Sequence, residues 1–255
     1  MKNVLIICGK EIKSYFRSPI AYLLMAIFAV IFGYFFFSAT AYFVQASMQS
    51  QMSGQSSPMN VNDFIIGPLL GNASVVGLFL IPMISMRLFA EEKRQGTMEL
   101  LLTSPIHDWE IVIGKFLGAL LMYATLLGIT ALDIGLLFIY GKPAWQPILT
   151  GYLGLLLQGG CLLAIGAYIS TTTKNQIVAA GATFGVCLLL YVLSWVTDMA
   201  QTTAAKVVSY LSVLSHFEPF SKGLIDTKDV VFYLSFIFFG LFLTTRSLES
   251  LRWRA

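Results

Sequence analysis

The sequence predicts an all-α membrane protein with six transmembrane helices, and three observations lead to this fold class. Of the 255 residues, 57% are hydrophobic and only 11% are charged, whereas soluble domains are about 25% charged. Six mostly apolar runs have the character of bilayer-crossing helices, which need about 20 residues each. Finally, most of the cations fall on one side of these runs. This composition excludes a soluble enzyme, a disordered chain and a nucleic-acid-binding domain.

The first element, residues 1–19, is predicted to be an amphipathic interfacial helix. Apolar side chains recur at helical spacing on one face, and cations and Gly9 occupy the other. The apolar face can therefore enter the headgroup boundary of the membrane, while the lysines meet anionic lipid. The apolar set is Leu5, Cys8, Ile12, Tyr15 and Phe16, and the cations are Lys2, Lys10, Lys13 and Arg17. A plain positively charged flank is the alternative. Ser18-Pro19 ends this helix, because proline disfavours helical geometry in the residue before it.

The six spans are predicted at residues 20–44, 64–86, 111–140, 148–170, 177–197 and 230–245, within a single membrane domain over 1–255. Gly67-Pro68 and Pro82 interrupt the second span, so we expect kinks or a re-entrant start there. The third span is longer than a bilayer requires and either tilts or projects into the cytoplasm. Residues 198–229 form an extracytoplasmic loop, in which Val207–Leu214 is apolar but too short to cross and is expected to be a surface or re-entrant helix.

The distribution of cations predicts the orientation. Twelve of the 16 Lys and Arg residues flank the side that carries both termini, and four lie on the other side. Because cytoplasmic loops carry the excess of Lys and Arg, both termini are expected in the cytoplasm.

The segment 87–110 is a dense charge cluster in a charge-poor chain. Arg87 and Glu91 stand four residues apart and can pair on a helix. Gly96 is expected to end that helix, and Thr97 to cap a second, short helix that contains Glu99 and a leucine run. Pro105 ends the short helix. A short helix with apolar and charged sides just below the membrane suits a docked cytoplasmic partner, and a solvated loop is the alternative.

These residues carry a family resemblance. Residues 89–105, FAEEKRQGTMELLLTSP, followed by Gly114-Lys115-Phe116, resemble the signature region of ABC-2 family permeases, the membrane subunits of a class of ATP-driven transporters. The resemblance covers essentially the whole chain and implies a fold like that of type II ABC exporters. The C-terminal part, from His216-Phe217-Glu218-Pro219 to residues 248–254, is similar to permeases of gliding-motility-associated bacterial systems.

The resemblance implies that the region around Gly96–Pro105 is a coupling helix that contacts an ATP-binding subunit. The residues carried over as this contact are Glu91, Glu92, Arg94, Gly96, Thr97, Glu99, Leu100, Leu102, Thr103 and Pro105. A second, minor cytoplasmic contact falls at Thr173, Lys174 and Asn175, and the N-terminal helix also touches the ATPase.

The same resemblance implies the partners. They are two ATP-binding subunits, a second permease that is identical or homologous, and membrane lipid. The complex is expected in a bacterial cytoplasmic (inner) membrane. The resemblance also allows for an extracytoplasmic accessory protein. The chain contains no GxxxxGK[ST] phosphate loop. We therefore expect no cofactor on this chain and no catalytic residues in it, with ATP and Mg²⁺ bound by the partner subunit.

Asp133 is predicted to be the one acidic residue well inside a span. Charged groups at depth usually face a cavity or a protein neighbour, so Asp133 either lines the transport path, forms a structural hydrogen bond to another span, or couples transport to protons. The three cysteines are widely spaced, and neither His107 nor His216 has a second ligand near it in the sequence, so no metal site is expected.

Two other classes of function fit the sequence less well than the permease. A self-sufficient secondary transporter or channel would show inverted repeats and several buried ionisable groups, and the sequence shows no repeat. An intramembrane enzyme would need paired catalytic residues at one depth, which the sequence lacks. The charged block between spans two and three is required only by the permease.

Overall fold

The computed structural model describes residues 2–52, 60–103, 105–140, 143–195 and 210–252, and all regular elements in these ranges are helical. The elements are α1 (Lys2–Arg17), α2 (Pro19–Met52), the π-helix η1 (Asn62–Ile66), α3 (Gly67–Ser85), α4 (Arg87–Gln95), α5 (Met98–Leu102), α6 (Asp108–Tyr140), α7 (Trp145–Thr172), α8 (Gln176–Val192), α11 (Glu218–Ser221) and α12 (Thr227–Arg252). The predicted all-α membrane fold is confirmed.

Five helical segments within the described ranges are long and apolar enough to cross a membrane. They are α2, the continuous stretch from η1 to α4, α6, α7 and α12, and α7 is the most buried of them. The fifth predicted span corresponds to α8, which has 17 residues. At 1.5 Å per residue α8 is about 26 Å long, slightly short of a hydrocarbon core of about 30 Å. The count of six spans therefore stays a prediction.

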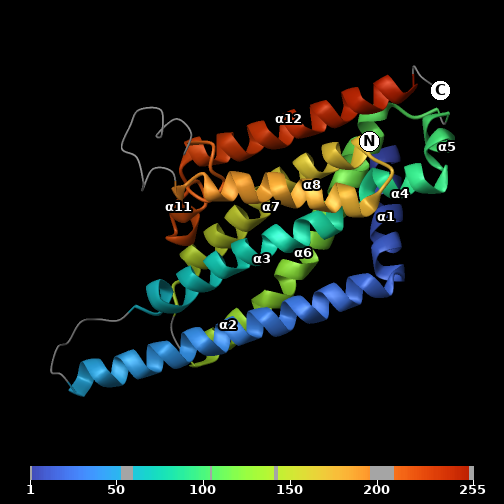
Figure 1. Cartoon of the computed structure of the whole chain (residues 1–255). Coiled ribbons are helices and arrows are strands. Elements are labelled where there is room, and N and C mark those ends of the chain that lie inside the picture. The colour runs from blue at the N-terminus through green and yellow to red at the C-terminus, as the bar shows by residue number, and fades with distance from the viewer. Residues whose placement is uncertain (1, 53–59, 104, 141–142, 196–209, 253–255) are drawn as a thin grey trace.

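The long helices run lengthwise beside one another, and α1 runs across them at one end of the bundle (Figure 1). The two chain ends, α4 and α5 also lie at this end, whereas α11 lies at the opposite end (Figure 1). Helix α2 continues to Met52, well past the predicted end at Val44, because residues 45–52 contain no glycine or proline to stop it.

The second span begins with the π-helix η1, which leads directly into α3 at Gly67; the kinks or re-entrant start expected there stay a prediction. The amide oxygen of Asn62 accepts a hydrogen bond from the backbone N–H of Ala144, at 3.1 Å, which ties this start to the beginning of α7. Of the apolar stretch Val207–Leu214, Tyr210 is helical and residues 211–214 form turns and irregular structure, while residues 207–209 lie outside the described residues. The surface or re-entrant helix expected there stays a prediction.

One expectation is corrected: the buried face of α1 differs from the predicted one, although the break at Ser18 is as predicted. Its buried side chains are Val4, Ile7, Cys8 and Tyr15, and they pack against the bundle, chiefly α6. Leu5, predicted on the apolar face, is 70% exposed. The periodicity correctly indicated an amphipathic helix but placed the buried face one position away, because neighbouring apolar residues at positions 4–8 allow either rotation.

Candidate functional site

The charged segment between α3 and α6 lies at the end of the bundle crossed by α1 (Figure 1). Gly96 ends α4 in the left-handed conformation, with φ of 72°. Non-glycine residues adopt this conformation only at a cost, so glycine suits the position. The α5 helix begins two residues later, at Met98. The predicted order of helix, break, short helix, break and helix is confirmed.

Thr97 does not cap α5 with its side chain, which corrects the sequence-based expectation. Its hydroxyl instead donates to the carbonyl oxygen of Glu92, at 3.4 Å, and its backbone N–H donates to the same carbonyl, at 3.1 Å. The tight turn at Gly96 brings Thr97 back over the last turn of α4. Its hydrogen bonds therefore satisfy a carbonyl oxygen at the end of α4 rather than the N–H groups at the start of α5.

Most of the predicted contact residues at the end of α4 and in α5 are exposed. Leu100 is 77% exposed, although leucine is usually buried. Exposed with it are Arg94, Gly96, Thr97, Glu99, Thr103 and Pro105, whereas Met98 is buried against the bundle. The side chain of Leu102 lies outside the described part of the chain. The short helix thus presents an apolar residue and an acidic residue to the outside while Met98 anchors it.

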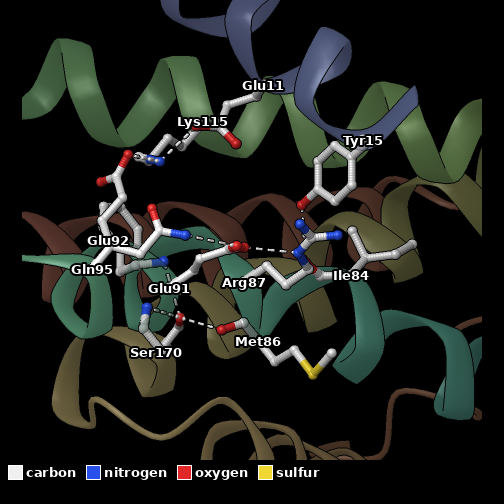
Figure 2. Close-up of polar contacts among 12 residues, drawn as sticks. Glu11, Tyr15, Ile84, Met86, Arg87, Glu91, Glu92, Gln95, Lys115 and Ser170 are labelled. Atoms are coloured by element: carbon white, nitrogen blue, oxygen red, sulfur yellow. Dashed lines mark hydrogen bonds and ion pairs between the residues drawn. The ribbon is translucent and has the colours of Figure 1, made fainter. Parts of the chain in front are cut away.

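The start of α4 is held by a side chain from another helix, Ser170 of α7 (Figure 2). Its hydroxyl oxygen accepts hydrogen bonds from the backbone N–H groups of Phe89, at 3.1 Å, and Ala90, at 3.0 Å, and donates to the carbonyl oxygen of Met86, at 3.1 Å. In an unbroken helix the Ala90 N–H would bond the Met86 carbonyl directly. The Ser170 hydroxyl takes that place in the ladder, which explains the break between α3 and α4.

Lys115 joins α6 to α1 and α4 through a buried ion-pair cluster (Figure 2). Its ammonium Nζ lies 2.6 Å from Glu11 Oε1 and 2.9 Å from Glu92 Oε1. The side chains are only 3%, 12% and 14% exposed for Lys115, Glu11 and Glu92. Lys10 approaches the same Glu92 oxygen at 3.9 Å, from the exposed side of α1. A buried charge is tolerated when it is paired in this way.

Two glycines on either side of Lys115 let α1 approach α6 closely enough to form this cluster. A Cβ atom on Gly114 would lie 2.8 Å from Ile7 Cβ, and one on Gly118 would lie 2.6 Å from Glu11 Cβ. Both distances are shorter than real Cβ contacts, so side chains at these positions would push α1 away. The glycines therefore position the Glu11 carboxylate over Lys115.

A further buried bond ties α1 to α3. The Tyr15 hydroxyl donates to the carbonyl oxygen of Ile84, at 2.9 Å, near the end of α3 (Figure 2). Burial, with the Glu11 carboxylate nearby, raises the pKa of Tyr15, so the phenol stays protonated and remains a donor. The Asn3 amide also donates to Glu110 Oε2 on α6, at 3.0 Å.

Two predicted contact residues, Glu91 and Glu92, have partners inside the chain. The Glu91 carboxylate accepts from Arg87, at 2.8 Å as predicted, and from Gln95, at 3.2 Å. Glu92 belongs to the Lys115 cluster. Their contact with an ATPase subunit stays a prediction, and the structure gives both an internal role that the sequence did not reveal.

The second predicted cytoplasmic contact follows α7 and lies close to α4. The Lys93 ammonium donates to the carbonyl oxygen of Thr171. Lys174 and Asn175 are exposed and Thr173 is half-buried. The Asn175 side chain accepts from the Ile177 N–H, at 2.9 Å, and so caps α8. This loop and α4 are therefore joined through the last turn of α7.

The remaining predicted site residue, Asp133 of α6, is half-buried, and no hydrogen bond or ion pair joins it to other described residues. Its role in a transport path stays a prediction. The structure gives His216 a partner that the sequence did not reveal. Its Nδ1 lies 2.6 Å from Asp229 Oδ1, and both side chains are buried at the end opposite α5. Within the described ranges, no group of three or more His, Cys, Asp or Glu residues could hold a metal ion.

Comparison with known proteins bears on this architecture. The model of the ABC-2 family transporter protein matches residues 5–238. The chain is 26% identical over 161 residues to the probable multidrug ABC transporter permease YbhR of Escherichia coli (strain K12), which covers 62% of this chain and 42% of that protein. It is 32% identical over 119 residues to the probable ABC transporter permease protein NosY of Pseudomonas aeruginosa, which covers 42% of this chain and 43% of that protein.

The matched region is thus less than half the length of each of these two relatives. The family match, in contrast, covers nearly the whole chain, including the helices that carry the charged segment and the Lys115 cluster. Together with the long apolar helices, it shows that this chain is a multi-pass membrane permease of the ABC-2 transporter family.

Proposed function

We propose that this chain is the membrane-spanning subunit of an ATP-binding cassette exporter and that α5 is its coupling helix. In this proposal a separate subunit binds ATP and Mg²⁺ and hydrolyses the nucleotide. The α5 helix docks on that subunit and passes its motion to the membrane helices. The work done is export or remodelling of the cell envelope.

The observation that carries the proposal is the contrast between the two sides of the charged segment. Leu100 and Glu99 of α5 are exposed at the end of the bundle, so they are available to a partner. Directly behind them, α4 is tied by buried contacts to three elements: α1 and α6 through the Lys115 cluster, and α7 through Ser170. A force applied to α5 would therefore reach several membrane helices rather than dissipate in a loop.

The excess of cations on the side of the termini supports placing this end in the cytoplasm of a bacterium, where ATP is available. Maleimide labelling of single introduced cysteines tests this placement. A cysteine at position 174 is expected to react with a membrane-impermeant maleimide only after the cells are opened, whereas one at position 222 is expected to react in cells with a permeabilised outer membrane.

The direct test of the function is affinity purification of the full chain from its native membrane in mild detergent, with mass identification and an ATPase assay of the bound proteins. The proposal expects an ATP-binding chain in near-equal amount, a second permease, identical or homologous, in the same complex, and hydrolysis that vanadate inhibits. A homogeneous complex that contains no nucleotide-binding chain would overturn it and favour a self-sufficient transporter. The resemblance to gliding-type permeases stays a prediction that the accompanying chains would test.

A further inference from the structure

One carboxylate stands alone in the apolar helices α6 and α7. Asp133 is the only charged residue between positions 116 and 140, and α7 carries no charged residue. It lies seven residues before the end of α6, which is about 10 Å along the helix. Asp133 is half-buried, and it has no hydrogen-bond or ion-pair partner among the described residues. A carboxylate in such apolar surroundings is costly unless it meets a partner.

A tyrosine of α7 adds a second acceptor beside this carboxylate. Tyr152 lies seven residues after the start of α7, and the Asp133 carboxylate acts electrostatically on its hydroxyl group. The hydroxyl oxygens of Tyr152 and Thr130 are 2.6 Å apart. The Thr130 hydroxyl donates its single proton to the carbonyl oxygen of Leu127, at 2.6 Å. Thr130 therefore accepts from Tyr152, and the Tyr152 oxygen is left able to accept but not to donate.

We infer that Asp133 and Tyr152 bind the ammonium group of an apolar amine, and that such amines are the substrate class of the proposed exporter. The inference deepens the proposed function and rests on it for the step of export. The two residues offer acceptors only, whereas an ammonium group offers donors only. A ligand that carries a carboxylate or a phosphate would find neither a donor nor a cation at this pair.

Apolar surface continues from the two acceptors toward the end of the bundle opposite α5. Leu136 follows Asp133 by three residues on α6, and Leu149 precedes Tyr152 by three residues on α7. Residues three apart lie on the same face of a helix, and these two leucines are 46% and 58% exposed. They can contact the body of the ligand, while the Tyr152 ring can stack on its cation. The site thus favours an amine with an apolar body.

An inorganic cation fits the pair less well than an ammonium group does. Ca²⁺ takes about six to eight oxygen ligands and Mg²⁺ about six, whereas this pair supplies one carboxylate and one phenol oxygen. Within the parts of the chain that the structure describes, no group of three or more His, Cys, Asp or Glu residues could hold a metal ion. An ammonium group needs fewer acceptors, so Asp133 and Tyr152 satisfy most of its donors.

The test measures binding of monodansylcadaverine, a primary amine with a fluorescent apolar body, to the purified full chain in detergent. Fluorescence anisotropy follows the binding and is corrected for micelles without protein. The comparison probe is N-dansyl-6-aminohexanoate, which ends in a carboxylate. The test variants are Asp133→Asn and Tyr152→Phe, and Asp133→Glu retains the charge. The matched control is Asp226→Asn, which removes an acidic residue from an exposed ion pair.

We expect the wild type to bind the amine at least about tenfold more tightly than the carboxylate probe, because the contact is charge-assisted. Asp133→Asn should weaken amine binding by about tenfold or more. Tyr152→Phe should weaken it by about threefold, since only the second acceptor is lost. Asp133→Glu and the control should each change it by less than about twofold. Size-exclusion chromatography shows which variants are folded, and Tyr152→Phe tests the site if Asp133→Asn is not.

Equal binding of the two probes to the wild type would overturn the inference. So would unchanged amine binding in a folded Asp133→Asn or Tyr152→Phe variant, or a loss in Asp226→Asn as large as in Asp133→Asn. The measurement needs no ATP-binding subunit. Amine binding that depends on Asp133, in a chain that co-purifies with no ATP-binding subunit, would therefore support the site and overturn the proposed function.

Discussion

The ammonium group of Lys115, on α6, lies 2.9 Å from a carboxylate oxygen of Glu92, on α4. The α5 helix lies between these two residues in the sequence, so the pair joins the two ends of the loop that carries α5. Glu11 of α1 completes the cluster at 2.6 Å. The position of α5 thus depends on a buried electrostatic contact.

Replacing Lys115 with methionine should destabilise the protein by about 3 kcal/mol, because it leaves the Glu11 and Glu92 carboxylates facing one another without a cation. Thermal unfolding followed by circular dichroism in detergent measures this. Lys174→Met removes an exposed cation at the same end and serves as the control. A Lys115→Met variant as stable as that control would show that the cluster contributes nothing to the fold.

Replacing Gly96 with alanine should cost about 1 kcal/mol, since the left-handed conformation is unfavourable for alanine although there is open space for its Cβ. Gly96→Asn should cost less, because asparagine adopts this conformation more readily. Gly128→Ala is the matched control: its Cβ also meets open space, but the residue is helical and alanine should not destabilise it. Equal effects of alanine at positions 96 and 128 would contradict the assigned role of the backbone turn.

Replacing Ser170 with alanine should remove the group that separates α3 from α4. The backbone N–H groups of Phe89 and Ala90 then lose the hydroxyl that accepts their hydrogen bonds, which should lower the free energy of unfolding by about 2 kcal/mol. The loss is smaller if the helix straightens and these groups bond its own carbonyl oxygens. In either case the distance between spin labels on α5 and on the end of α12 should change. Thr172→Ala, which removes an exposed hydroxyl bonded only within its own helix, should leave both stability and distance unchanged. Ser170→Thr, which retains the hydroxyl, should restore the wild-type distance.

The His216–Asp229 pair should be a strong contact at the opposite end of the molecule. His216 also stacks on Phe232, with ring centroids 3.9 Å apart, and its Nε2 lies 2.9 Å from the Tyr210 carbonyl oxygen. Asp229→Asn and His216→Ala should each destabilise the protein by about 3 kcal/mol, and the loss in the double variant should be clearly smaller than the sum of the two. Asp226→Asn, at the exposed pair with Lys228, is the control and should have no effect. Additive losses for positions 216 and 229 would refute a direct interaction.

Local signals were sufficient to predict much of this structure. The all-helical membrane class, the break at Ser18, the end of α4 at Gly96 and the Arg87–Glu91 pair all depend on residues within a few positions of one another, where helix geometry dictates the outcome. The cap predicted at Thr97 also depends on local sequence. That prediction was wrong because the end of α4 and the start of α5 compete for the same Thr97 side chain.

The contacts that hold the site could not be predicted in the same way. Glu11 and Lys115 are 104 residues apart, and Ser170 acts on backbone groups 80 residues earlier. In the sequence Lys115 looks like an ordinary cation that flanks a span, although Gly114 and Gly118 on either side of it are a signal for close helix packing. The pairing of His216 with Asp229 could not be predicted, because a contact across a turn leaves no periodic pattern in the sequence.

The most direct test of the account is whether an exposed leucine of α5 is needed to hold an ATP-binding subunit. Leu100→Arg changes a leucine that is 77% exposed, and Leu224→Arg makes the same change at a leucine that is 64% exposed before α12. If α5 is the coupling helix, Leu100→Arg should lose at least about nine tenths of the co-purified ATP-binding chain and of the vanadate-sensitive hydrolysis in purification from native membranes. Leu224→Arg should retain both. Equal recovery of the ATP-binding chain with the two variants would contradict the assignment of α5 as the coupling helix.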